Sequence, residues 1–215
     1  MKVIEPSYEI LTPITGNELE MIEKAARTCY KSESKISPES AAKLVANLIK
    51  NDHTAMLEHA PSLTIKFICD RGVSHEIVRH RMASFAQEST RYCNYTQDKF
   101  GNEITFIKPF FFDDEETYSC WEKAMAYVEK QYFELIKAGA TAQEARTVLP
   151  NSVKTEIVMT ANYREWRHFF KLRAARATGP AHPQMEELTI PLLNELKVKI
   201  PVIFDDIYPM GVEEA

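Results

Sequence analysis

Two stretches that lie far apart in the chain alternate apolar and polar residues, and they constrain the fold more than any other feature. At 63–69 apolar residues occupy every second position, and 153–161 alternates in a similar way. A period of two residues is typical of a strand with one buried face, so we predict a strand at each place. A third, shorter strand is expected at 104–107, before Pro109.

Helices are predicted around these strands from capping residues and from apolar residues spaced three or four apart. Asn17 with Glu20, and Thr141 with Glu144, have the spacing of a capping box. Gly139 marks the end of the clearest helix in the chain. The predicted helices begin after Asn17, at Ser37-Pro38, at Ser74 following a break at Arg71-Gly72, at residue 114, at Thr141, at Asn162 and at residue 183, and residues 82–94 are expected to be irregular.

The order of these elements predicts one mixed α/β domain of the α+β class, covering residues 1–215. Strands and helices do not alternate regularly, which favours a central, largely antiparallel sheet flanked by helices over a doubly wound parallel sheet. A chain of 215 residues is long enough to bury one sizeable core. We find no internal repeat and no linker that would divide it.

The charge and cysteine content argue against several classes of function. With 26 basic and 31 acidic residues the net charge is −5, so the field of the whole molecule opposes binding to nucleic acid or to a membrane surface. No stretch approaches the roughly 18 apolar residues of a membrane span. The four cysteines are widely spaced, as is typical of free thiols in a reducing compartment. We therefore expect a soluble, cytoplasmic protein.

Against this acidic background, one segment concentrates positive charge. It reads Arg79-His80-Arg81, then seven residues, then Ser89-Thr90-Arg91. Like charges repel unless an anion lies among them, and the interval before Arg91 holds only one acid, Glu88. Because guanidinium groups bind the oxygens of phosphate or carboxylate in pairs, the segment predicts a site for an anionic, phosphorylated ligand.

A second cationic region is predicted on the helix after Asn162. At helical spacing, Arg164, His168 and Lys171 share one face of this helix. Arg173 falls on the other face, among aromatic residues, where a buried guanidinium needs a partner. Arg173 is therefore expected either to pair inside the protein or to meet a ligand.

Other patterns that bind metals or phosphates are weak or missing. His53 and His59 are six residues apart, too far for two ligands on one helix face, so we predict no protein-only metal site. Neither of the two common glycine-rich cradles, G-x-G-x-x-G and G-x4-G-K-S/T, occurs in the sequence. A bound nucleotide is therefore expected to be held by side chains.

Taken together, these residues resemble the flavin-dependent thymidylate synthases. The diagnostic element of that family is Arg-His-Arg, seven residues and Ser, which matches Arg79-His80-Arg81-x7-Ser89. The segments at 53–59, 145–150, 162–164 and 168–173 resemble further motifs of the family. The resemblance runs from about residue 25 to about residue 190, nearly the whole chain.

The resemblance implies a reductive methylation of dUMP to dTMP. Methylenetetrahydrofolate would give the carbon, reduced FAD would give the hydride, and NADPH would reduce the flavin again. The family fold is a mixed α/β subunit assembled as a homotetramer whose active sites are shared between subunits. Such sharing would explain two separated cationic regions and the lack of a glycine-rich cradle. No nucleic-acid or membrane partner is expected.

Carried over position by position, the resemblance assigns roles to individual residues. Arg173 would be the catalytic residue, because a fixed positive charge against the uracil edge favours the anionic form of the ring and activates its carbon nucleophile. The residues implied for FAD are His53, Arg79, His80, Arg81, Gln87, Asn162, Arg164 and His168. The residues implied for dUMP are Glu76, Arg79, Gln87, Glu88, Ser89, Thr90, Arg91, Arg146 and Arg173.

Three departures from the family pattern and several rival interpretations stay open. The chain has Ala55, Ala86-Gln87 and Glu186 where relatives carry a hydroxyl, Asn-Glu and a basic residue. Cys93 is a candidate nucleophile for ordinary thymidylate synthase chemistry, although the flavin route needs none. The rivals to the enzyme are a nucleic-acid-binding module built on residues 79–95 and a relative that binds FAD without turnover.

Overall fold

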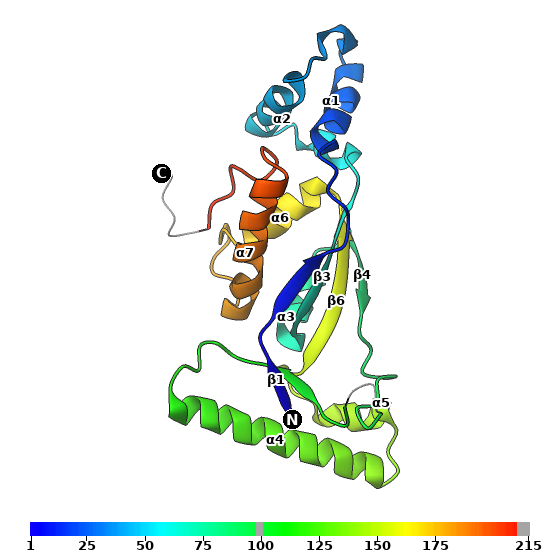
Figure 1. The fold of residues 1–215 in the computed structure, drawn as a ribbon, viewed down its shortest axis with the longest axis vertical. Helices are drawn as coiled ribbons and strands as arrows, with labels where there is room; N and C mark the ends of the chain where they lie inside the picture. Colours follow the sequence, from blue (N-terminus) through cyan, green and yellow to red (C-terminus); the bar gives the residue numbers. More distant parts are fainter. Residues whose placement is uncertain (98–100, 210–215) are drawn as a thin grey trace. The chain divides into compact units, whose positions relative to one another are not determined.

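The computed structural model describes residues 1–97 and 101–209 of the chain. Its main sheet has four strands in the order β2-β3-β6-β4 and is antiparallel (Figure 1). A second sheet joins β1 to β5 in parallel, with Val3 opposite Phe106. The strands are β1 (Lys2–Ile4), β2 (Ser7–Ile10), β3 (Leu63–Asp70), β4 (Ala83–Gln87), β5 (Thr105–Ile107) and β6 (Lys154–Ala161). The predicted mixture of helices and a largely antiparallel sheet is confirmed.

β3 and β6 are the two strands that the alternation of apolar residues predicted. Along β3 buried residues alternate with half-buried ones as far as Cys69, and β6 alternates in the same way along its whole length. The hydroxyl oxygens of Thr64 and Thr160 lie 2.9 Å apart and join these neighbouring strands. Because side chains alternate between the two faces of a strand, one face of each strand is buried and the other is partly solvated.

The helices lie close to their predicted positions. They are α1 (Glu18–Thr28), α2 (Ser40–Lys50), α3 (Arg71–Ile77), α4 (Glu115–Lys137), α5 (Ala142–Ala145), α6 (Tyr163–Arg173) and α7 (Pro183–Lys199), with short 3-10 helices η1 (Glu33–Lys35), η2 (Thr54–His59) and η4 (Arg146–Val148). The backbone turns at Gly139, after α4, with a φ of +99°, which a glycine adopts without strain. The capping box at Thr141 and Glu144 is present as predicted.

Two predicted helix starts and one predicted cap were wrong. α1 begins directly after Asn17, as predicted, but the Asn17 side chain makes no capping hydrogen bond, and the Glu18 carboxylate accepts from the Thr15 N–H at 2.9 Å. α3 begins at Arg71 rather than at Ser74, since the Asp70 carboxylate accepts from the Val73 N–H at 2.7 Å and caps the helix there. α2 begins at Ser40, two residues after the proline that was expected to open it.

The prediction of an irregular segment over residues 82–94 was also wrong in part. Residues 83–87 form β4, which lies beside β6 in the sheet. Its sequence, Ala-Ser-Phe-Ala-Gln, has little strand propensity, and pairing with a strand about 70 residues away decides its conformation.

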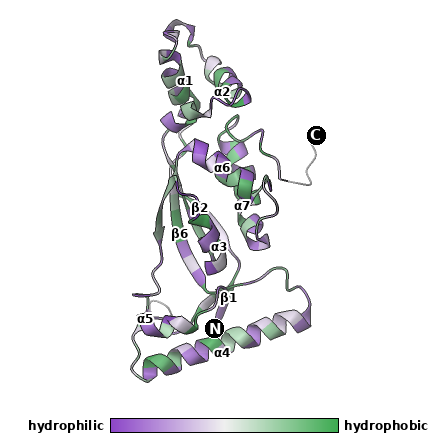
Figure 2. Ribbon diagram, turned by 180° about the vertical axis from the view of Figure 1, so that it is seen from behind, coloured by the Kyte–Doolittle hydropathy of each residue, from purple (hydrophilic) through white to green (hydrophobic). Residues whose placement is uncertain are grey.

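The described residues gather into two compact units, and neither is a continuous stretch of chain. Unit 1 contains residues 1–7, 67–79 and 85–158, and unit 2 contains residues 8–66, 80–84 and the chain from 159 onward. Hydrophobic and hydrophilic residues alternate along α4 (Figure 2), whose Trp121, Met125 and Tyr132 lie in the core of unit 1. In unit 2 the rings of Trp166, Phe169, Phe170 and Phe204 pack edge to face or stacked.

No helix in the described part of the chain combines the length and the hydrophobicity that crossing a membrane requires.

Candidate active site

In unit 2, the predicted site residues His80, His168 and Arg173 lie together around one buried imidazole. α6 supplies the surroundings, because Asn162 caps the helix by accepting from the Glu165 N–H at 2.9 Å and so sets the turns that follow. The His80 Nδ1 lies 3.1 Å from Oε1 of Glu165. Arg173 Nε lies 3.3 Å from His80 Nε2 on the other side of the ring. The ring also packs edge-on to Phe169 and to His168, with centroids 4.9 and 5.6 Å apart.

This environment keeps His80 uncharged at neutral pH. Burial is the largest of three causes that together lower the pKa of His80 to about 4, and the others are the electrostatic effects of Arg173 and His168. The contact with Glu165 is therefore a hydrogen bond from a neutral imidazole rather than an ion pair. Burial also raises the pKa of the Glu165 carboxyl, while His168 opposes that effect.

A pocket of about 730 Å³ lies within unit 2, where α1 packs on α2 and on η2, and where η2 packs on α6. His53 and Arg164, both predicted to bind the flavin, line it. Arg164 donates to the Glu58 carboxylate at 2.8 Å, which joins α6 to η2. The remaining lining is partly apolar and partly basic, and consists of Ala26, Arg27, Cys29, Tyr30, Ser32, Lys35, Leu44, Leu48, Asp52, Ala55 and Met56.

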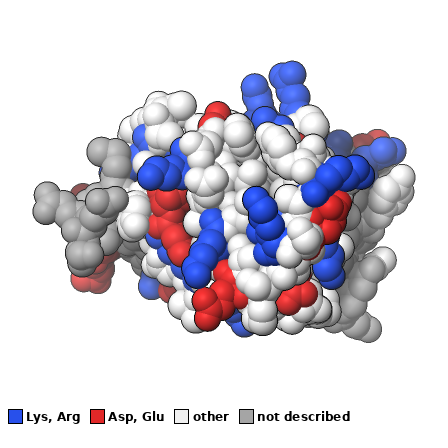
Figure 3. Space-filling model, turned by 90° about the horizontal axis from the view of Figure 1, so that it is seen from above, with Lys and Arg blue, Asp and Glu red and all other residues white. Residues whose placement is uncertain are grey.

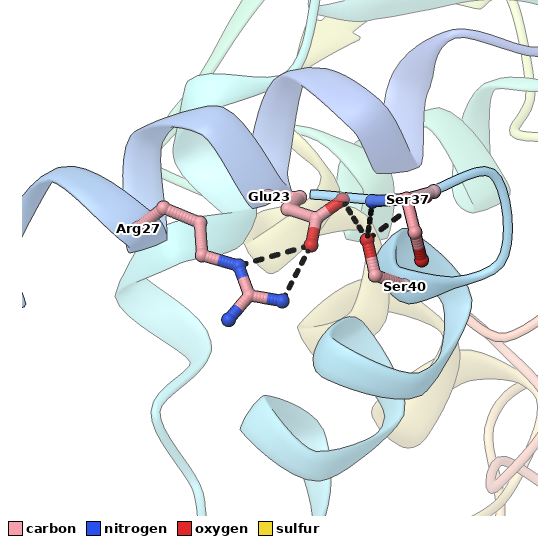
Figure 4. A network of polar contacts seen from close by, with 4 residues as sticks. All are labelled: Glu23, Arg27, Ser37 and Ser40. Atoms are coloured by element: carbon pink, nitrogen blue, oxygen red, sulfur yellow. Dashed lines mark hydrogen bonds and ion pairs between the residues drawn. The ribbon is translucent and has the colours of Figure 1, made fainter. Parts of the chain in front are cut away.

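Arg27 is a pocket residue that the sequence reasoning missed. Its guanidinium donates from Nε and Nη2 to Oε1 of Glu23, which is only 2% exposed (Figure 4). The other oxygen of that carboxylate accepts from the Ser40 hydroxyl, whose oxygen accepts from the Ser37 N–H. The signal that could have found it is the spacing of Glu23 and Arg27, an i, i+4 pair on one face of α1.

In unit 1, the structure brings together several residues predicted to bind dUMP. Arg146 Nη1 donates to the hydroxyl of Thr90 at 3.4 Å across 56 residues of sequence. The Ser89 hydroxyl accepts from the Arg91 N–H at 3.3 Å, and its carbonyl accepts from the Tyr92 and Cys93 N–H groups, which forms a tight turn. Ser89, Thr90 and Arg91 therefore lie in one loop, and the side chain of Arg146 contacts that loop at Thr90.

Gln87 and Glu88 are both engaged with the protein itself. The side-chain amide of Gln87 donates to the hydroxyls of Ser74 and Thr155, at 2.9 and 3.2 Å. The Glu88 carboxylate pairs with Lys154 at 2.9 Å. The one acid of this segment is thus neutralised by a lysine of β6, and it does not offset the charge of the neighbouring arginines.

The remaining predicted residues are exposed or only half-buried. Arg79, Arg81 and Arg91 are exposed, and Arg91 lies over the ring of Tyr92 at 5.4 Å. Glu76 is half-buried on α3. Of the predicted flavin residues, all but Arg79 and Gln87 belong to unit 2, and of the predicted nucleotide residues, all but Arg173 belong to unit 1.

Further observations bear on the open questions. No group of three or more metal-ligating side chains occurs within residues 1–97 and 101–209. Glu186 accepts two hydrogen bonds of 2.6 Å from Arg176. Side chains of both charges lie interspersed on the face seen in Figure 3, so that view shows no broad field of one sign.

Comparisons with known proteins agree with this picture. The sequence model of the family described as "Thymidylate synthase complementing protein" matches residues 11–202. A flavin-dependent thymidylate synthase of Pyrococcus furiosus is 34% identical, with 93% of this chain and 81% of the relative covered. One from Corynebacterium aurimucosum is 32% identical over 87% of this chain and 79% of the relative.

Solved structures share the fold. A crystal structure of the UMP/dUMP methylase PolB from Streptomyces cacaoi, bound with 5-Br dUMP, superposes with a TM-score of 0.78 and 23% identity, covering 95% of this chain and 96% of that one.

Proposed function

Because the chain belongs to the family of thymidylate synthase complementing proteins, we propose that it catalyses the flavin-dependent reductive methylation of dUMP to dTMP. The observation that carries this proposal is the match of the family over residues 11–202, nearly the whole chain. We propose methylenetetrahydrofolate as the carbon donor and NADPH as the reductant. FAD, when bound, supplies the hydride.

The pocket of unit 2 fits a large, planar, doubly phosphorylated cofactor. Its volume of about 730 Å³ lies in the range of small-molecule sites. Arg27, Lys35 and Arg164 supply basic groups that suit a diphosphate, and apolar residues of α1, α2 and η2 suit a ring. We propose that His53 and Arg164 hold FAD there. The other residues proposed to take part in binding the flavin are Arg79, His80, Arg81, Gln87, Asn162 and His168.

We propose that the loop after β4 holds the nucleotide. Arg146 and Arg91 carry the positive charge that a phosphate needs, and Arg146 contacts the hydroxyl of Thr90 in this loop. Glu76, Arg79, Gln87, Glu88 and Thr90 complete the proposed set. We propose that Arg173 lies against the uracil edge, where its charge would stabilise the anionic ring as the carbon attacks.

We also propose that residues 1–215 work as one domain, because β3, β4 and β6 each contribute residues to both units. A homotetramer with shared active sites is proposed for the assembly, since the flavin and nucleotide residues fall largely in different units. Within the described residues the four cysteines form no disulfide, which supports a reducing compartment, and we propose the cytoplasm.

One experiment tests the proposed function. The purified protein should be yellow, with a flavin absorbance spectrum that changes when dUMP is added, and it should form dTMP from dUMP, methylenetetrahydrofolate and NADPH. A flavin-loaded protein without dTMP formation would identify a relative that only binds FAD. A colourless protein that does not bind added FAD, yet binds RNA with a steep salt dependence, would identify a nucleic-acid-binding module.

A further inference from the structure

We propose that Glu165 is a positioning residue for the reaction, and that it acts through His80 to hold the guanidinium of Arg173. Glu165 is not among the residues that the family pattern assigns to the site. The inference rests on the proposed function, because it takes Arg173 as the residue that meets the uracil ring.

The geometry of α6 shows why an intermediary is needed. Glu165 and Arg173 lie eight residues apart on the same helix, which separates their backbones by about 12 Å along the axis. His80 enters from outside the helix and contacts both, with Nδ1 at 3.1 Å from the carboxylate and Nε2 at 3.3 Å from Nε of the guanidinium. Phe169, midway between them on α6, packs against the imidazole at 4.9 Å and fixes the ring in this position.

The chemistry of the three groups determines where the proton sits. The Nε–H of an arginine can only donate, so Nε2 of His80 must accept. The single proton of the neutral ring is then on Nδ1 and is donated to Glu165. Glu165, His168 and Arg173, all on α6, face His80, and burial together with the positive charge of Arg173 keeps the imidazole neutral. In this relay Arg173 donates to His80 and His80 donates to Glu165, so Glu165 selects the tautomer of His80.

Removing Glu165 would disturb this arrangement at both nitrogens. His80 is 4% exposed, so an Nδ1–H without an acceptor would be left buried, at the full cost of its desolvation. The ring would then favour the other tautomer, whose Nε2–H faces the Nε–H of Arg173. Two donors cannot share a hydrogen bond, and the guanidinium of Arg173 would lose its contact with His80.

The first test compares variants of Glu165 in the flavin-loaded enzyme. Glu165→Ala should lower kcat about ten- to a hundredfold, the usual effect of losing a partner that orients an active group, with flavin content and the KM for dUMP nearly unchanged. Glu165→Gln keeps an acceptor oxygen and should lose less than about fivefold.

Asp206→Asn is the matched control. It weakens an ion pair between Arg167, which lies on the same helix, and Asp206, which lies after α7. Arg167 donates to Asp206 at 2.6 and 2.7 Å. It should lower the melting temperature but leave kcat within about twofold.

The second test asks whether Glu165 acts through Arg173. In a double-mutant cycle, Glu165→Ala should add little further loss in kcat to Arg173→Lys, because a relay that ends at Arg173 has nothing left to position. Additive losses would overturn the inference. With ¹⁵N-labelled histidine, wild-type His80 should give the signals of a neutral ring protonated on Nδ1, and Glu165→Ala should shift them towards the Nε2–H tautomer while Asp206→Asn does not.

The outcomes separate the two proposals. If the wild-type enzyme forms dTMP while Glu165→Ala keeps full kcat and an unchanged His80 tautomer, only the positioning role is overturned. If the wild-type enzyme forms no dTMP under any of these conditions, the proposed function itself fails, and the His80 tautomer still reports on the relay.

Discussion

Arg27 and Glu23 are joined by two hydrogen bonds to a single carboxylate oxygen, at 3.0 and 2.8 Å. The second oxygen of Glu23 is held by Ser40 of α2. The pair therefore couples the packing of α1 on α2 to the position of a basic group in the wall of the pocket. A side chain that is held in place before binding loses less conformational entropy when a ligand arrives.

Glu23→Ala should for this reason weaken FAD binding. We expect the dissociation constant to rise about tenfold, which is the effect of losing one charge-assisted contact or its preorganisation. Titration of the flavin-free protein with FAD, followed by absorbance or by quenching of flavin fluorescence, measures it. Glu39→Ala is a suitable control, because Glu39 pairs with Lys43 on the exposed surface of α2. Equal affinities for all three proteins would show that the contact of Glu23 with Arg27 does not contribute to FAD binding.

Arg173→Lys should lose most turnover while the flavin stays bound. A lysine keeps the positive charge but cannot reproduce the planar fork of donors or the Nε–H that contacts His80. We expect kcat to fall about a hundredfold, similar to the loss of one electrostatic stabilising group in other active sites. Steady-state formation of dTMP, with flavin content measured on the same sample, checks this. Near-native turnover would remove Arg173 from its catalytic role.

Cys93→Ala should retain turnover. Cys93 is half-buried beside the turn at Ser89, close to the proposed nucleotide loop, so it is the thiol best placed to attack the ring. The hydride from flavin makes such an attack unnecessary, and we expect kcat within about threefold of the wild type. If the variant binds flavin and dUMP normally but makes no dTMP, a thiolate mechanism is indicated instead.

His80 should make the stability of the protein sensitive to acid. Its pKa falls from 6.5 to about 4 on folding, so between these values the unfolded chain binds a proton that the folded protein does not. The free energy of unfolding therefore rises with pH across this window, and about 3 kcal/mol should be lost as the pH falls from 7 to 4. Below the folded pKa the loss is complete.

The variant His80→Gln lacks this titration and should show a flatter dependence of stability on pH. Urea unfolding at fixed protein concentration, at several pH values from 4.5 to 7.5, provides the comparison. Parallel curves for the two proteins would show that His80 is not a buried neutral group.

Local sequence signals predicted those elements whose boundaries depend on nearby residues. The caps at Thr141 and Asn162 each act within three residues, and the structure contains both. Alternation predicted β3 and β6, because one buried face imposes a period of two. The start of α3 was predicted at Ser74, whereas the structure begins the helix at Arg71, where the Asp70 carboxylate caps it.

The sequence by itself determined the mixture of helices and antiparallel strands, the family, and the set of charged residues that could bind anions. Only the tertiary structure decided which of those charges meet. Glu165 has the position of a capping residue in the sequence, yet its carboxylate lies against His80, 85 residues away. Glu88 lies among arginines in the sequence, yet it pairs with Lys154. Contacts of this kind depend on how separate segments pack. No periodic or local pattern in the sequence predicts which residues form them.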